Sequence, residues 1–529
     1  MYIDTLFTCL VIIGLTSILC YALFQVLNNA FFLNNLLILL VFIVFQYWNQ
    51  MALVLLHIIC PLLLINTVFY VFFHNAQVPN ATNPRYQVTF QTTRGNFKLD
   101  NIKRGASVIG SAGSGKTESI VYAFLRHFRK EKFCGIIHDY KDFELTEMAY
   151  PLFMDGEIPF KIISFDKIIH RVNPIAPHYL ENEESVHEIS RVIIENLLEN
   201  RESGATGTSK FFNDAAEGLI GGLIWKLKTT YPKFCTLPHL IAIYQYLDTD
   251  RLICFLESNI TSRAMADAFI SGKDSDKQTA GVKSTLANAL KRISTQRIFM
   301  ALSEDEVPLN INSNENPCVI AVVNNPKYES SYSPVIATII HTITKQMSVR
   351  NSEPSFLLME EAPTIRLLNM HRIPATLRSY NISTVYVMQD KIQNDMMYGD
   401  KASKAILSNL SYQFFGKAND PDTAKYYERF FEIVKDPTKS VNRGYNLNFD
   451  TRVTTGEKEI PKIRANVFFR LKQGEFITYA DGRDKKVQFK LRGIEKELPK
   501  DTKRFTKADL EANFKRVYKE VRLLFESDK

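Results

Sequence analysis

The first 83 residues have almost no charge: Asp4 is the single acidic side chain, and no lysine or arginine precedes Arg85. A segment of this kind can enter a lipid bilayer, where a charged side chain would cost several kcal/mol. Transport pathways through a membrane usually contain charged groups, and none lies in the middle of these apolar stretches. We therefore interpret the segment as a membrane anchor rather than as a permease.

Cysteine is sparse and scattered. The chain has seven, none in a C-x-x-C pair, and three of them (Cys9, Cys20 and Cys60) lie in apolar segments. This pattern indicates a reduced compartment rather than a disulfide framework. No group of His and Cys has the spacing of metal ligands, and no nucleophile–base pair stands out.

Three apolar stretches make up the anchor. Leu6 to Leu27 and Met51 to Phe73 each have about 22 residues, so each helix would reach roughly 33 Å, enough to cross a bilayer. Phe31 to Trp48 is interrupted by Asn34 and Asn35, and its uninterrupted part would reach only about 20 Å. Two or three crossings are both compatible with this pattern. A cleaved signal peptide is an alternative for the first stretch, but the basic n-region of such peptides is missing.

The basic residues after the last apolar stretch give the expected orientation. Five of them lie between positions 85 and 104, and no acidic residue precedes Asp100 there. Because Lys and Arg flank membrane helices on the cytoplasmic side, everything after residue 80 is predicted to be cytoplasmic. Beyond the anchor the chain has 64 basic and 55 acidic side chains. This mild surplus permits contact with nucleic acid or anionic lipid without demanding it.

A glycine-rich loop fits the pattern G-x-x-x-x-G-K-[ST]. It follows a short apolar stretch, Ala106 to Ile109, that is typical of a buried strand, and precedes Glu118 to Lys130, which has helical periodicity. Glycines let backbone N–H groups surround a phosphate, the lysine meets the β- and γ-phosphates, and the threonine hydroxyl binds Mg²⁺. We therefore predict nucleotide binding by Gly110, Ser111, Ala112, Gly113, Ser114, Gly115, Lys116, Thr117 and Glu118, with Lys116 also catalytic and Thr117 also on the metal.

A second strand ends in two acids. Phe356 to Met359 is apolar, and Glu360 and Glu361 follow it directly. P-loop hydrolases need a carboxylate at the end of a neighbouring strand for Mg²⁺ and for the attacking water. We predict that Glu360 binds the metal through water and that Glu361 orients or deprotonates the water.

Two further residues are candidates for catalysis. The apolar stretch Thr384 to Met388 ends at Gln389, whose amide could sense the γ-phosphate or hold the water. Arg378 lies just before that stretch and could act as an arginine finger that reaches a neighbouring subunit. Either residue could also be an ordinary polar side chain at the end of a strand.

The order of these motifs resembles the type IV secretion coupling proteins, the ATPases of conjugative DNA transfer. The resemblance runs from roughly residue 95 to 480. It is carried by GSAGSGKTES, IIHDYKDFEL at Ile136 to Leu145, VNPI at Val172 to Ile175, the helical stretch Ser209 to Leu227, and Leu357 to Gln393.

In the last of these blocks the family typically has an acidic pair, an arginine before Tyr-Gly-Ile, and a strand ending in Gln. These match Glu360 and Glu361, Arg378, Tyr380 to Ile382, and Gln389. Two departures are present. Glu360 stands where the family usually has Asp, and Tyr140 and Asp142 occupy the Pro and Gly positions of its Asp-Pro-Lys-Gly-Glu-like turn.

The resemblance implies a RecA-like α/β P-loop nucleotide-binding domain with an inserted all-α subdomain, preceded by N-terminal transmembrane helices. It implies ATP and Mg²⁺ as cofactors and DNA-stimulated ATP hydrolysis. It also implies a homo-hexamer in the bacterial inner membrane, multi-pass, with the bulk of the chain cytoplasmic. Its partners would be single-stranded DNA with a relaxase, the components of a type IV secretion channel, and the lipid membrane.

The rest of the chain fits this plan. Residues from Glu181 to about Leu302 have helical periodicity and separate two strand-like stretches, so we predict a helical subdomain inserted in the α/β domain. The expected divisions are an anchor over 1–80, a first nucleotide-binding part over 81–180, the inserted subdomain over 181–302, a second nucleotide-binding part over 303–495, and a C-terminal amphipathic helix over 496–529.

Four local expectations concern the last hundred residues. Residues 440–462 are polar and are predicted to be irregular, and residues 468–479 are predicted to form a closing hairpin around Gln473 and Gly474. The basic run 483–492 is either a half-buried edge strand or a strip that tracks phosphates. The helix expected from 507 to 525, with Thr506 as its N-cap, packs either on its own domain or on a partner.

Two other functions compete with DNA export by a coupling protein. One is a pump for double-stranded DNA, against which the inserted helical subdomain argues. The other is a nucleotide-binding membrane adaptor that docks cargo without hydrolysis, which Glu360 in place of Asp keeps open.

Overall fold

The computed structural model describes residues 2–26, 30–45, 54–76, 83–198, 207–443, 451–491, 493–500 and 505–526. Contacts divide the chain into two compact units, Met1–Asn83 and Pro84–Lys529. Each unit is described by itself.

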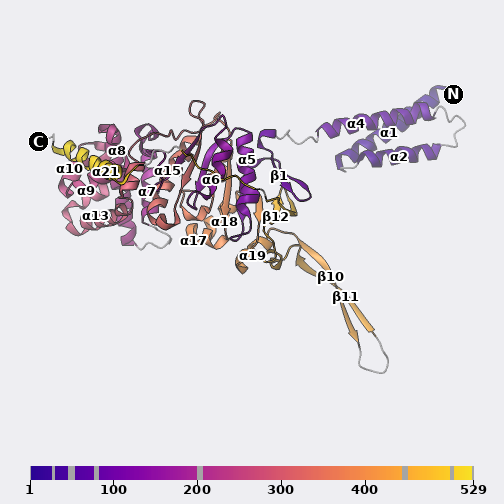
Figure 1. Ribbon diagram of the computed structural model, residues 1–529. Coiled ribbons are helices and arrows are strands. Elements are labelled where there is room, and N and C mark those ends of the chain that lie inside the picture. Colours follow the sequence, from indigo (N-terminus) through magenta and orange to yellow (C-terminus); the bar gives the residue numbers. More distant parts are fainter. Residues whose placement is uncertain are drawn as a thin grey trace. The chain divides into compact units, whose positions relative to one another are not determined.

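The first unit consists of apolar helices (Figure 1). They are α1 (Tyr2–Val26), α2 (Ala30–Phe45), the π turn η1 (Leu55–Ile59) and α4 (Cys60–Ala76). The segments Leu6–Phe24 and Leu55–Phe72 are long and apolar enough to cross a membrane, and Ala30–Val44 is shorter. Of these two segments, 11% and 22% of the residues are buried, whereas the core helix of a soluble protein is mostly buried.

Asparagines connect the short helix to its neighbours. Asn34 and Asn66 are fully buried, and Asn34 Nδ2 donates a hydrogen bond to Asn66 Oδ1 at 3.0 Å. Asn66 Nδ2 in turn donates to Asn35 Oδ1 at 3.0 Å. The two residues that interrupt the second apolar stretch therefore hold α2 against α4, as polar side chains do between membrane helices.

The second unit is built on a nine-stranded sheet in the order β13-β12-β9-β3-β8-β7-β4-β6-β5. The strands from β9 to β5 are parallel, and β12 and β13 extend this sheet in antiparallel fashion. Their bounds are β3 (Ala106–Ile109), β4 (Cys134–Asp139), β5 (Phe160–Ile163), β6 (Val319–Val323), β7 (Ser355–Met359), β8 (Ile382–Met388), β9 (Tyr412–Phe415), β12 (Glu475–Ala480) and β13 (Arg483–Gln488).

Helices cover both faces of this sheet (Figure 1). Every residue of β3, β4, β7 and β8 is buried, which explains why these strands are mostly apolar. Alternate residues enter two different cores: Phe356 faces one, where its ring stacks on Phe128 at 4.3 Å, and Leu357 faces the other. The predicted α/β fold is confirmed.

The helices beside the sheet are α5 (Tyr122–Lys130), α6 (Glu144–Phe153), α15 (Glu329–Met347), α16 (Ile373–Arg378), α17 (Lys391–Tyr398), α18 (Asp400–Ser408) and α19 (Pro421–Glu428). A small hairpin of β1 (Val88–Thr92) and β2 (Gly95–Leu99) precedes β3. Short 3₁₀ turns occur at Pro84–Tyr86, Ile102–Arg104, Pro177–Tyr179, Pro232–Phe234, Ser271–Asp274, Pro326–Tyr328 and Ala362–Thr364.

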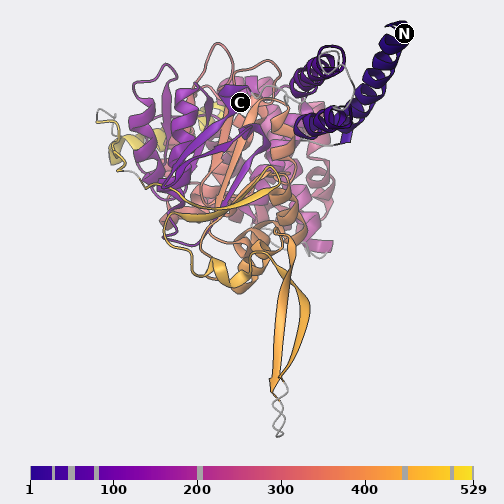
Figure 2. The same cartoon turned by 90° about the vertical axis from the view of Figure 1, so that its right-hand side faces the viewer.

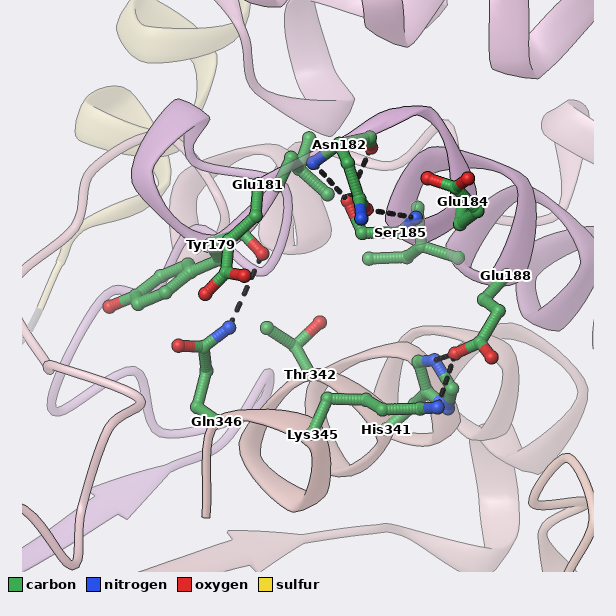
Figure 3. A pocket seen from close by; sticks show the side chains of 12 residues that line it. Tyr179, Glu181, Asn182, Glu184, Ser185, Glu188, His341, Thr342, Lys345 and Gln346 are labelled. Atoms are coloured by element: carbon green, nitrogen blue, oxygen red, sulfur yellow. Dashed lines mark hydrogen bonds and ion pairs between the residues drawn. The ribbon is translucent and has the colours of Figure 1, made fainter. Parts of the chain in front are cut away.

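Between β5 and β6 the chain is helical, as its periodicity predicts. The helices are α7 (Glu183–Leu197), α8 (Gly207–Thr230), α9 (Leu237–Tyr246), α10 (Thr249–Glu257), α11 (Ile260–Met265), α12 (Asp267–Ile270), α13 (Asp276–Lys291) and α14 (Gln296–Ala301). They meet the sheet domain where α7 packs on α15. There Glu188 of α7 pairs with Lys345 of α15 and lies 3.8 Å from His341 Nε2, and these side chains form one wall of a pocket of about 260 Å³ (Figure 3).

The C-terminal helix α21 (Lys507–Glu526) packs on its own chain, against α9 and α14. Val517 and Val521 are buried, and His239 of α9 hydrogen-bonds Glu520 at 2.9 Å. The Thr506 hydroxyl accepts a hydrogen bond from Asp509 N at 3.2 Å, so the predicted N-cap is confirmed.

Two predictions for the C-terminal region are wrong. Residues 440–462, predicted to be irregular, belong largely to a long antiparallel hairpin of β10 (Ile433–Arg443) and β11 (Thr451–Pro461), which extends away from the sheet (Figures 1 and 2). Ile433 is 69% exposed, and the residues from 432 to 437 are all exposed. Because this hairpin buries no apolar face at its base, its sequence lacks the alternation that identifies a strand.

The closing hairpin also lies elsewhere than predicted. Phe468 ends the short helix α20 (Ala465–Phe468), and the tight turn between β12 and β13 is Asp481-Gly482. Both turn residues have positive φ, 50° and 75°, which is the reason why Asp-Gly favours such turns. Strand β13 lies at the edge of the sheet, which agrees with one of the two interpretations of the basic run 483–492. Position 492 lies outside the described residues.

Candidate nucleotide-binding site

The glycine-rich loop follows the carboxyl end of β3, which lies between β8 and β9. Gly113 and Gly115 have φ of +74° and +85°, a conformation that other residues rarely adopt. The chain then enters a π turn, η4 (Thr117–Val121), which continues into α5. The predicted strand, loop and helix are therefore present, although the first helical turn is wider than an α-helical one.

Lys116 is enclosed by its own loop. Its side chain is only 7% exposed, and its ammonium donates hydrogen bonds to the carbonyl oxygens of Gly110 and Ser111. The hydroxyls of Ser111 and Ser114 are buried without a hydrogen bond to any described residue. The loop therefore surrounds the Lys116 ammonium and leaves the hydroxyls of Ser111 and Ser114 available for a ligand, as a phosphate-binding loop requires.

The two acids lie at the carboxyl end of β7, two strands away from β3. Glu360 and Glu361 are 1% and 3% exposed. Glu361 has φ of +45°, and its Oε1 accepts a hydrogen bond from Gln389 Nε2 at 3.0 Å. Glu360 is held by its backbone, since its N–H donates to His138 O at 3.1 Å. The structure therefore brings Glu361 and Gln389 together beside Glu360.

Electrostatic effects connect the acids to the loop lysine. Burial lowers the pKa of Lys116, and the charge of Lys141 lowers it further, while Glu361 and Glu360 act in the opposite direction. Burial and, after it, the neighbouring Asp139 raise the pKa of Glu360 to about 8. The charges of Glu360, Glu361 and Lys141 therefore all act on Lys116.

Glu360 fits a metal ion. Neither carboxylate oxygen of this buried side chain has a hydrogen bond to any described residue. A buried carboxylate without donors is costly, and Mg²⁺ prefers carboxylate and hydroxyl oxygen ligands. Thr117, at the start of η4, carries the hydroxyl that the loop motif assigns to the same ion.

Lys141 was not predicted as a site residue. Its Nζ lies 3.2 Å from Glu361 Oε1 and 3.6 Å from Glu360 Oε1. Burial disfavours its ammonium, but Glu360 and Glu361 outweigh burial and raise the pKa of Lys141. Lys141 is the lysine of the turn after β4, and β4 pairs with β7, so the position of this turn in the family pattern was a usable signal.

A second unpredicted contact covers the loop from outside. Gly474 N donates a hydrogen bond to Ser114 O at 2.9 Å, and a side chain at Gly115 would meet Gly474 N at 3.0 Å. Gln473 and Gly474, which were expected to form a hairpin turn, instead form a loop that rests on the phosphate cradle. No local sequence signal identifies this contact.

Arg378 lies near the amino-terminal end of β8, whereas the loop and the acids lie at the carboxyl ends of the strands. It ends α16 and precedes β8, whereas the glycine-rich loop follows the carboxyl end of β3, a parallel neighbour of β8. A strand of this length spans roughly 20 Å. Arg378 is exposed, and the structure does not bring it to Lys116 of the same chain.

The fold and this loop define a P-loop α/β protein. The family model described as "Type IV secretory system Conjugative DNA transfer" matches residues 74–431, and the chain belongs to this family. The expected relationship to the coupling proteins of conjugative DNA transfer is confirmed, and a pump for double-stranded DNA is not favoured. No protein with a curated description matches the chain.

Solved structures of the conjugative coupling protein TrwB are similar. The unbound bacterial TrwB without its first 70 residues is 12% identical with a TM-score of 0.61, covering 80% of this chain and 92% of that one. Its complexes with the GTP analogue GDPNP (12% identical) and with ADP and Mg²⁺ (13% identical) each have a TM-score of 0.59, covering 75% of this chain and 88% of theirs. At these identities the similarity shows the fold.

Proposed function

We propose that this protein is a membrane-anchored ATPase that couples single-stranded DNA, with its attached relaxase, to a type IV secretion channel. The observation that carries the proposal is the buried pair Glu360 and Glu361, whose charges act on Lys116 of the glycine-rich loop, within a chain of the conjugative DNA-transfer family. The titles of similar structures name ADP with Mg²⁺ and nucleotide analogues as ligands of TrwB, which supports ATP and Mg²⁺ as cofactors here.

The proposed roles follow from the contacts of each side chain. The loop from Gly110 to Glu118 holds the phosphates, and Thr117 and Glu360 hold the metal. When bound, MgATP supplies a phosphoryl group for transfer to water, with the metal neutralising charge on it. Glu361 accepts a proton from the attacking water, and Gln389 keeps the Glu361 carboxylate in position through its hydrogen bond.

Assembly and location are part of the proposal. The two long apolar helices support anchoring in the bacterial inner membrane, with the rest of the chain in the cytoplasm. A homo-hexamer would give Arg378 a role, because this exposed arginine cannot serve its own loop but could reach that of a neighbouring subunit. The divisions 1–80, 81–180, 181–302, 303–495 and 496–529 remain our proposed domains.

Steady-state hydrolysis by the full chain in detergent tests this function. Turnover should rise with single-stranded DNA, more than with duplex DNA, and the stimulation should fall with salt because phosphate contacts are screened. Lys116→Ala should lose nucleotide binding. Glu361→Gln should bind nucleotide but hydrolyse it at least about 100-fold more slowly.

Lys130→Ala, which removes an exposed lysine at the end of α5, is the matched control and should hydrolyse at the wild-type rate. Full-rate hydrolysis by both site variants would remove the catalytic assignment. Nucleotide binding without any turnover that depends on Glu361 would favour the alternative, an adaptor that docks cargo.

A further inference from the structure

A lysine bridges the two carboxylates of the candidate site. Lys141 Nζ lies 3.2 Å from Glu361 Oε1 and 3.6 Å from Glu360 Oε1. Within the described part of the chain, no other basic side chain forms an ion pair with either carboxylate. The Lys141 side chain is 35% exposed and the two carboxylates are almost fully buried, so the ammonium reaches the pair from the solvent side.

The backbone that carries this lysine is fixed on both sides. Asp139 Oδ1 accepts a hydrogen bond from Lys141 N at 3.1 Å, and Asp142 N donates to Asn324 O at 3.1 Å. Asp139 is itself held, since its Oδ2 accepts from Thr146 N at 2.7 Å and from Thr146 Oγ1 at 2.6 Å. The position of the ammonium is therefore set by the turn between β4 and α6, and only the side chain of Lys141 is left to move.

The positive charge of Lys141 lies where the two acids need a counter-ion. When both are ionised, two adjacent buried carboxylates need positive charge nearby, and neither side-chain oxygen of Glu360 has a hydrogen bond within the described residues. A divalent cation would supply that charge at the same oxygens that Lys141 now approaches. An ammonium and a dication cannot both sit against the pair without strong repulsion.

We propose that Lys141 is a positioning residue that acts as the resident counter-ion of Glu360 and Glu361 and competes with the divalent cation for Glu360. Without metal, its ammonium lies against the Glu361 carboxylate and the Glu360 carboxyl group and holds both side chains in place. With metal, the ammonium leaves the pair, so Lys141 sets the affinity of the site for the ion. This inference rests on the proposed function, in which Glu360 is a metal ligand.

Metal binding to the nucleotide-free full chain in detergent tests the competition, with Mn²⁺ as the probe and free Mn²⁺ measured by electron paramagnetic resonance. Lys141→Met removes the competing charge and should bind Mn²⁺ at least about tenfold more tightly than wild type. Lys141→Gln keeps a polar side chain and should show the same gain, which guards against a folding defect in either variant. Lys141→Arg keeps the charge and should bind like wild type.

Lys167→Met is the matched control. Lys167 lies on the same side of the sheet, with its ammonium 4.9 Å from the centre of the Phe143 ring, but it contacts neither acid. Its removal changes net charge equally and should leave Mn²⁺ affinity within about twofold, because exposed charges are screened by salt.

The outcomes separate this inference from the function on which it rests. If Glu360→Gln abolishes Mn²⁺ binding but Lys141→Met and Lys141→Gln bind like wild type, the competition is overturned and the metal site stands. If Glu360→Gln leaves binding unchanged, the metal site itself is refuted. A gain in Lys167→Met equal to that in Lys141→Met also overturns the proposal, because net charge alone would then explain it.

Discussion

Gln389 and Glu361 are joined by a hydrogen bond, Nε2 to Oε1 at 3.0 Å, across the ends of two adjacent parallel strands. The bond fixes the carboxylate that we propose as the base. Glu361 itself follows the end of β7, and its backbone has a left-handed conformation. It also gives Gln389 a role in positioning that its place in the sequence only suggested.

Loss of this bond should slow hydrolysis without loss of nucleotide. We expect Gln389→Ala to lower kcat by about 10- to 100-fold, because Glu361 is no longer held, while nucleotide affinity stays within a few-fold. Gln393→Ala is the control, since that exposed side chain lies on α17 and makes no contact with the acids. An unchanged kcat in Gln389→Ala would show that the bond has no role in turnover.

Metal binding should release a proton from Glu360. Burial and Asp139 raise the pKa of this carboxyl to about 8, so at pH 7 it is largely protonated before the metal arrives, and a metal ligand must be ionised. Calorimetric titration of Mg²⁺ in buffers of different ionisation enthalpy should show about one proton released at pH 7 and nearly none at pH 9. Enthalpies that do not depend on the buffer at pH 7 would contradict this.

Mild acid should destabilise the fold through His341. Burial, then Lys345, lower its pKa to about 4, whereas an unfolded histidine titrates near 6.5. The contribution of neutral His341 is therefore complete above about pH 6.5 and is lost as pH falls toward 4. Between pH 7.5 and 5.5 this amounts to roughly 1 kcal/mol.

Urea unfolding of wild type and His341→Gln at the two pH values measures this contribution. The variant should lose about 1 kcal/mol less between them than wild type does. His187→Gln, which removes an exposed histidine from α7, should keep the wild-type dependence. Equal losses in wild type and His341→Gln would rule His341 out as the cause.

The loop that rests on the phosphate cradle should affect nucleotide affinity. Gly474 has φ of +76°, and a side chain there would lie 3.0 Å from Gln488 Nε2. We expect Gly474→Ala to cost about 1 kcal/mol of stability and to weaken ADP binding several-fold, because the hydrogen bond to Ser114 O is disturbed.

Gly482→Ala is the control that separates the effect of backbone strain from the effect of losing the contact with Ser114. Gly482 has nearly the same φ, +75°, but nothing lies within 4 Å of a side chain placed there. A similar loss of stability with unchanged ADP affinity is expected for Gly482→Ala. Equal ADP affinity in the two variants would mean that the contact with Ser114 does not support the cradle.

Local patterns predicted those parts of the fold whose residues act within one segment. The glycine-rich loop, the apolar strands β3, β7 and β8, and the helices between β5 and β6 all follow from periodicity and from residue type. The hairpin of β10 and β11 was missed because its described side chains at 433–437 and 456–459 are exposed, so no alternation of buried and exposed residues identifies a strand there. The hairpin turn lies at Asp481-Gly482 and not at Gln473-Gly474, because the pairing of β12 with β13 decides which of these two glycine-containing segments becomes the turn.

The sequence by itself determined which groups could meet a nucleotide, since Lys116, Thr117, Glu360 and Glu361 belong to patterns that each lie in one short segment. Only the tertiary structure decided which groups meet one another. The order of the parallel strands places β4 beside β7, so that Lys141 reaches the acids, and the folding of the C-terminal strands places Gly474 on the loop. Such contacts depend on strand order and long-range packing, and neither is encoded in the spacing of residues along the chain.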